Sequence, residues 1–238
     1  MTTDFRIYLL IGLFIYLCII VIFFNSVIRR RSKSKNVLSN KEIENWDYIL
    51  PDQMFVEQKG KRHKRYLIKK LAHSKALIFY SISLSKFKEK TWLIYDEYLA
   101  KNHLAFERLA DIYLKKNEFK KACYVSFVSD FPEITKYSPQ VLSTLTYYLK
   151  DADEKNNLLP MTALRMFSNC GSIKAFINVV QMINDNKVFI HEHALTTEIY
   201  YFNGDKEQLL KQLQKHKYKW SESIANSIDA IMWSDENK

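Results

Sequence analysis

Residues 104–113, LAFERLADIY, carry the clearest helical pattern in this chain. Their apolar side chains return every third or fourth position, which is the spacing of one face of an α-helix. The positions on that face are Phe106, Leu109, Ala110 and Tyr113. The 238 residues include only 4 Gly and 4 Pro, fewer than strands joined by tight turns would need. We therefore expect an all-α fold.

Helices of this kind recur in pairs outward from that stretch. The predicted helix–turn–helix units cover 106–129, 160–184 and 193–215. Each turn holds a Gly or Asn able to adopt the left-handed conformation that ends a helix, and Gly171 and Gly204 lie 33 residues apart. Ser138 before Pro139 predicts a further helix start, with Ser as the N-cap. A repeat of this length predicts an α-solenoid, in which each hairpin buries its apolar face against the next.

The hairpins resemble known repeat families. Phe106, Leu109, Ala110, Tyr113, Asn117, Phe119 and Ala122 have a spacing similar to one tetratricopeptide unit. The units from Leu164 to Val180 and from Leu195 to Leu213 look more like HEAT-type units. The layout as a whole resembles bacterial membrane-anchored HEAT-repeat proteins. That resemblance implies a scaffold, of a kind often encoded beside glycosyltransferases and linked with surface-polysaccharide machinery.

Toward the N-terminus, residues 7–28 hold no charged side chain. A run of this length can cross the roughly 30 Å of bilayer hydrocarbon as a helix. A cleaved signal peptide would need a basic start and a small-residue cleavage site, and an interfacial helix would need a polar face; the run has neither. We therefore expect an all-α chain in which a single N-terminal transmembrane helix precedes the α-solenoid.

Basic residues follow that run directly. Residues 29–90 hold 17 Lys or Arg against 6 Asp or Glu, whereas residues 91–238 hold 18 against 19. This asymmetry predicts the N-terminus outside and the bulk of the chain in the cytoplasm, at the cell membrane. It also favours anionic lipid headgroups over nucleic acid as a partner. The predicted membrane-surface residues are Arg29, Arg30, Arg31, Lys33, Lys35, Lys61, Arg62, Lys64 and Arg65.

These features divide the chain into four parts. We expect a signal anchor over 1–28, a basic juxtamembrane connector over 29–62, a HEAT- or tetratricopeptide-like repeat domain over 63–233 and a polar tail over 234–238.

No pattern for catalysis, cofactors or metals stands out. The chain has no glycine-rich phosphate-binding motif and no G-x-S-x-G. His191 and His193 suggest a metal, but residues i and i+2 of a helix point about 200° apart and cannot share one ion. Asp151, Asp153 and Glu154 fit a solvated loop. We therefore expect a protein that is not an enzyme, with no catalytic, cofactor-binding or metal-binding residues and no small-molecule substrate.

Adjacent aromatic residues suggest where a protein partner binds. Tyr148 and Tyr200 are expected in the core, whereas Tyr147 and Tyr201 lie at the rim or form a protein-binding surface. The function expected from these features is a membrane-anchored scaffold that binds a protein partner. A ligand-sensing regulator of a membrane partner and an enzyme with an unrecognised site are the alternatives.

Overall fold

The computed structural model describes residues 40–47, 50, 60–150 and 157–236. The chain divides into two compact units, Met1–Trp46 and Asp47–Lys238. All regular secondary structure among the described residues is helical, in agreement with the all-α prediction. A short helix covers 40–47, and the remaining helices belong to the second unit.

The prediction also placed a membrane-spanning helix before the helical array, and this part of the fold class is corrected. None of the helices that the structure describes is long and apolar enough to cross a membrane. Residues 7–28, on which the expectation rests, lie outside the described residues. The described residues support the helical array alone.

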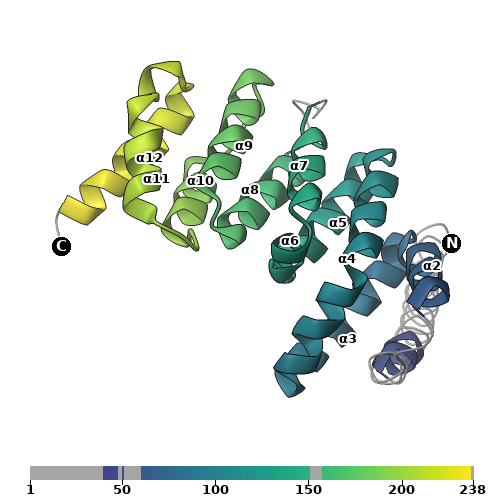
Figure 1. Cartoon of the computed structure of the whole chain (residues 1–238). Helices are drawn as coiled ribbons and strands as arrows, with labels where there is room; N and C mark the ends of the chain where they lie inside the picture. Colours follow the sequence, from purple (N-terminus) through teal and green to yellow (C-terminus); the bar gives the residue numbers. More distant parts are fainter. Residues whose placement is uncertain (1–39, 48–49, 51–59, 151–156, 237–238) are drawn as a thin grey trace, which may run out of the picture. The chain divides into compact units, whose positions relative to one another are not determined.

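The second unit is a succession of helices joined by short connections (Figure 1). Their bounds are α2 Gly60–Leu71, α3 Ser74–Lys90, α4 Trp92–Leu114, α5 Glu118–Asp130, α6 Glu133–Tyr137, α7 Pro139–Tyr147, α8 Leu158–Cys170, α9 Ile173–Asp185, α10 Glu192–Tyr200, α11 Lys206–Lys215 and α12 Glu222–Glu236. A short 3-10 helix, η2 Lys217–Lys219, precedes α12.

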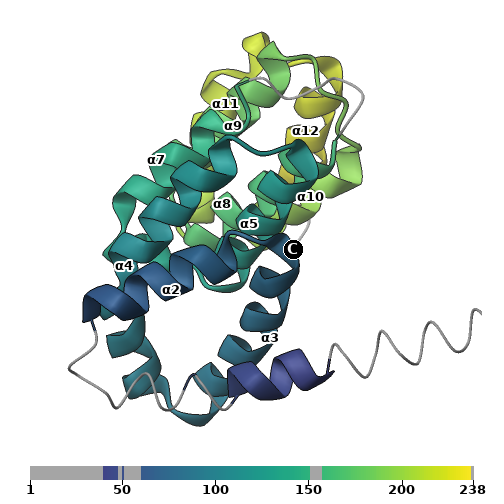
Figure 2. The same cartoon turned by 90° about the vertical axis from the view of Figure 1, so that its right-hand side faces the viewer.

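These helices alternate between two layers, seen side by side in Figure 2. The first layer holds α3, α5, α8, α10 and α12, and each member packs against the next. The second layer holds α2, α4, α7, α9 and α11, which pack in the same successive way, while the short α6 packs against α4 and α7. Because consecutive helices change layer and successive pairs stack, the arrangement is consistent with an α-solenoid.

The connections between the layers gather at two edges. Connections from the first layer to the second lie at residues 91, 131–138, 171–172 and 201–205, and we call this side the asparagine edge. The described residues of the connections from the second layer to the first are 72–73, 115–117, 148–150, 157, 186–191 and 216–221, and we call this side the lysine edge. In Figure 1 the lysine edge follows the upper ends of α5 to α12, and the asparagine edge their lower ends.

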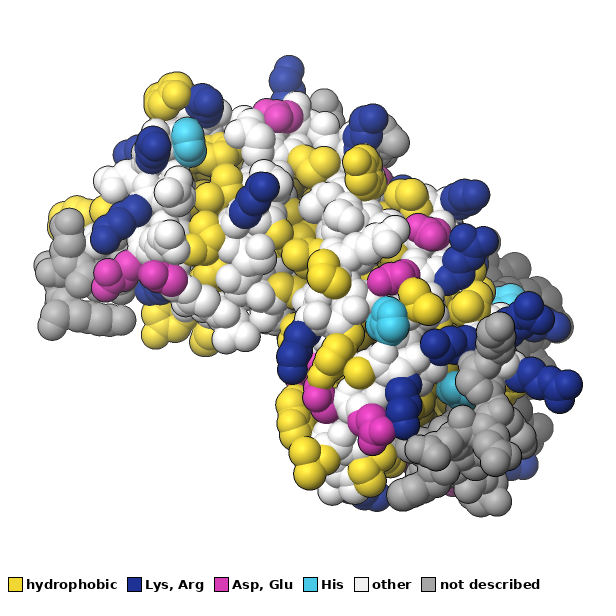
Figure 3. Space-filling model, in the orientation of Figure 1, with side chains coloured by type: hydrophobic (Ala, Val, Ile, Leu, Met, Phe, Trp, Pro, Cys, Tyr) yellow, Lys and Arg dark blue, Asp and Glu magenta, His cyan; other side chains and the backbone are white. Residues whose placement is uncertain are grey.

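Exposed lysines gather at the lysine edge, within about one turn of the helix ends. They are Lys69, Lys70, Lys75, Lys115, Lys120, Lys150, Lys187, Lys215 and Lys219. The exposed carboxylates described there are fewer: Asp185, Glu192 and Glu222. In Figure 3 dark-blue basic side chains stand among yellow ones along the upper border. The described residues of this edge therefore carry more basic than acidic exposed side chains, although residues 91–238 as a whole are nearly neutral.

Buried tyrosines hold neighbouring helices together through their hydroxyl groups. Tyr113 of α4 donates to the carbonyl of Leu71 at the end of α2 (2.8 Å), and Tyr148 after α7 donates to the carbonyl of Ala110 in α4 (2.5 Å). Tyr124 of α5 stacks on Tyr113 with 5.1 Å between ring centroids. Because a buried hydroxyl without a partner costs free energy, these bonds favour one particular packing of the layers.

The apolar face predicted within residues 104–113 is confirmed, since its four members are fully buried. The predicted helix start at Pro139 is also confirmed, with Ser138 as the N-cap residue. The Ser138 hydroxyl does not cap the helix, however. It donates instead to the carboxylate of Glu107 on α4 (2.9 Å), so it ties α7 to its layer neighbour.

One predicted hairpin runs opposite to the other two. The unit over 106–129 passes from the second layer to the first and turns at the lysine edge. The units over 160–184 and 193–215 pass from the first layer to the second and turn at the asparagine edge. The direction changes because α7 stands as a single full helix between the first unit and the second. The three units are therefore not equivalent repeats.

Candidate functional site

The predicted membrane-surface residues are only partly described. Arg29, Arg30, Arg31, Lys33 and Lys35 lie outside the described residues, as does the side chain of Lys61. The other three lie on α2, where Arg62 and Arg65 are exposed and Lys64 is half-buried.

The two predicted partner-binding tyrosines, Tyr147 and Tyr201, are 60% and 69% exposed. Tyr147 ends α7 at the lysine edge, whereas Tyr201 follows α10 at the asparagine edge. They lie at opposite edges and do not form one surface. Tyr148 is buried as expected, but Tyr200 is 51% exposed, which corrects its expected place in the core. The chain turns after Tyr200, and Phe202 takes the buried position instead.

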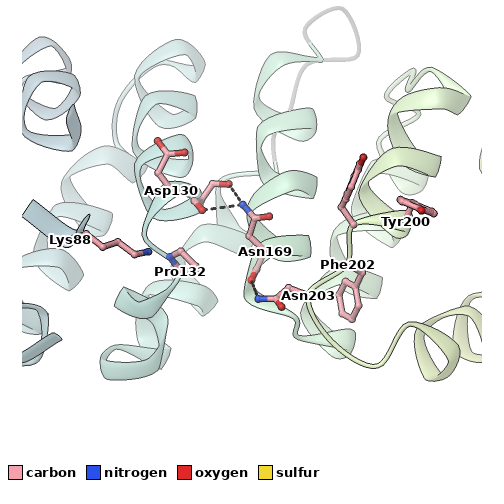
Figure 4. A pocket seen from close by; sticks show the side chains of 9 residues that line it. Lys88, Asp130, Pro132, Asn169, Tyr200, Phe202 and Asn203 are labelled. Atoms are coloured by element: carbon pink, nitrogen blue, oxygen red, sulfur yellow. Dashed lines mark hydrogen bonds between the residues drawn. The ribbon is translucent and has the colours of Figure 1, made fainter. Parts of the chain in front are cut away.

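A groove of about 530 Å³ opens at the asparagine edge beside Tyr201 (Figure 4). Its walls come from the ends of α3, α5, α8 and α10, which are successive members of the first layer. The lining residues are Lys88, Ser129, Asp130, Pro132, Asn169, Tyr200, Tyr201, Phe202 and Asn203.

Asparagine side chains connect the successive turns along the floor of this groove. The Asn169 amide donates to the carbonyl (3.0 Å) and the hydroxyl (2.9 Å) of Ser129, one helix back in the first layer. The Asn203 amide donates in the same direction to the Asn169 carbonyl (3.1 Å), and its backbone N–H donates to the Ser168 carbonyl (3.0 Å). Figure 4 shows the side-chain bonds as one ladder across α5, α8 and α10. The ladder fixes the spacing of the groove walls.

Gly171 allows the two turns to approach this closely. It ends α8 with φ +66°, in the left-handed region where other residues are strained. A Cβ atom at this position would overlap the backbone carbonyl of Asn203. Glycine is thus required both by the turn and by the contact between turns.

The segment after α10 holds Tyr201 toward solvent. Phe202 is buried against Phe176 with ring centroids 5.6 Å apart, and Asn203 is bonded to the preceding turn. The Tyr201 ring meets the Tyr200 ring edge-on at 5.1 Å. Both exposed rings therefore extend from a short segment that is fixed at its next two residues.

At the other end of the groove, Lys88 is enclosed by aromatic rings and a carboxylate. Its ammonium lies 2.7 Å from Glu133 Oε1, 5.4 Å from the Trp92 ring centroid and 5.5 Å from that of Tyr95. The Tyr95 hydroxyl donates to the second oxygen of Glu133 (3.0 Å). The charge of Lys88 is thereby largely compensated within the protein.

Two carboxylates flank Arg165 on the exposed side of the first layer. Asp130 ends α5 and Glu198 lies on α10, with α8 and its Arg165 between them. Partial desolvation raises the pKa of both carboxyl groups, and attraction to Arg165 opposes the rise. Charges of alternating sign along one row would align a polar partner in a particular register. They would contribute less to its binding affinity.

His191 and His193 do not diverge as the helical spacing predicted. His191 is the N-cap residue of α10 with extended backbone, and its ring nitrogen accepts from the His193 N–H (3.3 Å). The two rings stack in parallel with centroids 5.4 Å apart. Across the described residues, no group of three His, Cys, Asp or Glu side chains could hold a metal ion.

Sequence patterns missed the groove as a site, although its turns were recognised. The signal that could have found it is the 34-residue separation of Asn169 and Asn203, which lie two residues and one residue before a Gly. Ser129 lies 40 residues before Asn169, because α6 and the connection after α7 lengthen that interval. A search for a strict 34-residue repeat would therefore miss Ser129.

No protein-family model matches this chain, and neither a curated protein nor a solved structure matches it. The resemblance to HEAT-repeat proteins stays a prediction, as does the cellular location inferred from the N-terminal residues.

Proposed function

We propose that this chain is a non-enzymatic scaffold whose helical array binds a protein partner in the groove at the asparagine edge. The single observation that supports this function best is the fixed presentation of Tyr200 and Tyr201 above a polar groove. Tyrosine is enriched at protein interfaces, where its ring supplies contact area and its hydroxyl supplies a hydrogen bond.

Preorganisation makes the two rings suitable for binding. A flexible loop would lose conformational entropy on association, which weakens binding. Here the buried Phe202 and the bonded Asn203 already hold the segment. The two exposed rings can therefore contact a partner with little further ordering.

The opposite wall limits what the partner can present. Because Lys88 is already paired with Glu133, it is a poor site for a partner carboxylate. Asp130 also lines the groove and is exposed. A partner segment with a hydrogen-bond donor or cation near Asp130 and an apolar side chain near Tyr201 fits these walls best.

Site-specific photo-crosslinking in the cells that make the protein tests this function. The full chain would carry p-benzoylphenylalanine in place of Tyr201, and a matched chain would carry it in place of Tyr147. Both positions are exposed aromatic positions, so the fold should tolerate both changes. We expect a discrete protein adduct from position 201 and not from position 147.

A second substitution shows whether the adduct depends on the groove. Tyr200→Ala in the chain labelled at 201 should lower the adduct yield about tenfold or more, because a tyrosine at the centre of an interface is often a binding hot spot. Circular dichroism would verify that this variant is folded. The same protein adduct from both labelled positions, or no adduct from position 201, would refute a partner site in this groove.

A further inference from the structure

A row of exposed aromatic side chains follows the lysine edge. Phe119, Tyr147, Phe189 and Tyr218 are between 60% and 80% exposed. One of them lies at each of the four successive connections from the second layer to the first, beginning with the connection after α4. These rings are not part of the buried core, and their repeat at successive connections distinguishes them from apolar side chains scattered singly over a surface.

An exposed lysine accompanies each ring within three residues. These lysines are Lys120, Lys150, Lys187 and Lys219. The Lys219 ammonium lies 5.6 Å from the centroid of the Tyr218 ring. The described residues at each of these connections thus include one exposed aromatic ring and at least one exposed lysine.

The chemistry of this row distinguishes between classes of partner. Protein interfaces are depleted in lysine relative to the rest of a protein surface. Arginine, with its planar guanidinium, is the residue of choice for nucleic-acid recognition, and no arginine lies within one turn of these four connections in the described residues. Lysine and aromatic rings together are typical of the bilayer interface, where rings sit at the headgroup level and lysines meet anionic headgroups.

We infer that the lysine edge docks on the surface of an anionic phospholipid bilayer. The rings of Phe119, Tyr147, Phe189 and Tyr218 enter the headgroup region, and the adjacent lysines contact lipid phosphate and carboxylate groups. The surface lies at the edge opposite the groove, so a bilayer and a protein partner can be bound together. This inference does not depend on the proposed protein-binding function.

Photo-crosslinking of the full chain on vesicles tests the docking of this edge. p-Benzoylphenylalanine would replace Phe189 in one chain, Tyr218 in a second and Tyr201 at the asparagine edge in a third. Vesicles of phosphatidylcholine, with or without phosphatidylserine, provide the bilayer, and mass spectrometry detects lipid adducts at each position. We expect adducts at 189 and 218 on the anionic vesicles, and about tenfold fewer on neutral vesicles or at position 201.

A charge reversal at the edge makes the test specific. Lys187→Glu with Lys215→Glu should lower the adduct at position 218 at least about tenfold, since each basic residue near an anionic leaflet contributes roughly fivefold. Lys136→Glu with Lys174→Glu changes the net charge equally at the asparagine edge and should leave the adduct unchanged.

Three results would overturn the docking of this edge on a bilayer. The first is an equal lipid adduct at 201 and 218, and the second is an adduct that does not depend on lipid charge. The third is a single-stranded oligonucleotide that crosslinks at 218 and excludes lipid, which would assign the edge to nucleic acid.

Discussion

The two edges of the helical array join the same layers but present different chemistry. At the asparagine edge, Asn203 bonds to Asn169, and Asn169 bonds to Ser129, so that neighbouring turns are fastened side by side. At the lysine edge, Asn186 also bonds back to the carbonyl of Leu149, but aromatic rings and lysines extend beyond the connections. One edge thus forms a groove with fixed walls, and the other forms a row of side chains suited to a surface.

Two connections illustrate the difference. The connection after α8 needs only Gly171 and Ser172, because a glycine with positive φ reverses the chain at once. The connection after α9 covers 186–191, and there Lys187 is the described non-glycine residue with positive φ, at +53°. The two-residue turn at Gly171 brings two backbones into contact, whereas the connection over 186–191 leaves room for the exposed side chains of Lys187 and Phe189.

One shared core is expected to support both edges, and alkaline titration tests this with the largest expected effect. Burial raises the pKa of Tyr80, Tyr98, Tyr113, Tyr124 and Tyr148. Their folded-state pKa values exceed the unfolded value of about 10, so their contribution to stability is present below pH 10 and is lost as the pH rises above it. We expect cooperative unfolding at alkaline pH.

The readout for this titration is tyrosinate absorbance at 295 nm measured beside circular dichroism at 222 nm. Ionisation of the buried tyrosines should coincide with the loss of helix signal. Two separate transitions in the helix signal would mean that the edges are supported by independent cores.

Among the described residues, Gly171 and Lys187 have positive φ, and substitutions at these two positions should give the next largest difference in stability between the edges. Gly171→Ala forces a Cβ onto the Asn203 carbonyl and strains the backbone, so we expect a loss of about 3 kcal/mol in the free energy of unfolding. Lys187→Gly relieves a strained conformation, so stability should stay unchanged or rise by up to about 1 kcal/mol. Urea unfolding of both variants would measure the difference. Equal changes in the free energy of unfolding would contradict a tighter packing of the turn at Gly171 than of the connection at Lys187.

Removal of the two asparagine amides should have smaller effects. Asn169→Ala deletes two hydrogen bonds to Ser129, and we expect a loss of about 1–2 kcal/mol. Asn186→Ala deletes one hydrogen bond, to the Leu149 carbonyl, and about 1 kcal/mol or less should be lost. Thermal unfolding of the two variants gives the ranking. A larger loss of stability from Asn186→Ala than from Asn169→Ala would mean that the turns of the lysine edge, and not those of the asparagine edge, are held together more strongly.

Local patterns predicted the helices well, because burial follows spacing along one helix. The face of Phe106, Leu109, Ala110 and Tyr113 is buried, and the turn at Gly171 is left-handed. The expectation for the other turns was wrong: Asn117 has φ −66° and caps the start of α5 instead, where its side chain accepts from the Lys120 N–H.

The candidate site could not be predicted in the same way, because an edge is assembled from residues far apart in the chain. Tyr147 and Tyr201 look alike in sequence, yet they lie at opposite edges, since α7 and α10 belong to different layers. The lysine edge could not be predicted from the sequence for a related reason. Residues 91–238 have nearly balanced charge, and only the alternation of layers brings lysines such as Lys120, Lys187 and Lys219 to one side.

Hydrogen–deuterium exchange of the full chain, with and without phosphatidylserine-containing vesicles, tests the division between the edges most directly. We expect slower exchange on vesicles for the lysine-edge amides of residues 115–121, 186–191 and 216–221. Amides of residues 171–172 and 201–205, at the asparagine edge, should exchange at the same rate in both samples. Slower exchange at the asparagine edge, or unchanged exchange at the lysine edge, would contradict the docking of the lysine edge on a bilayer.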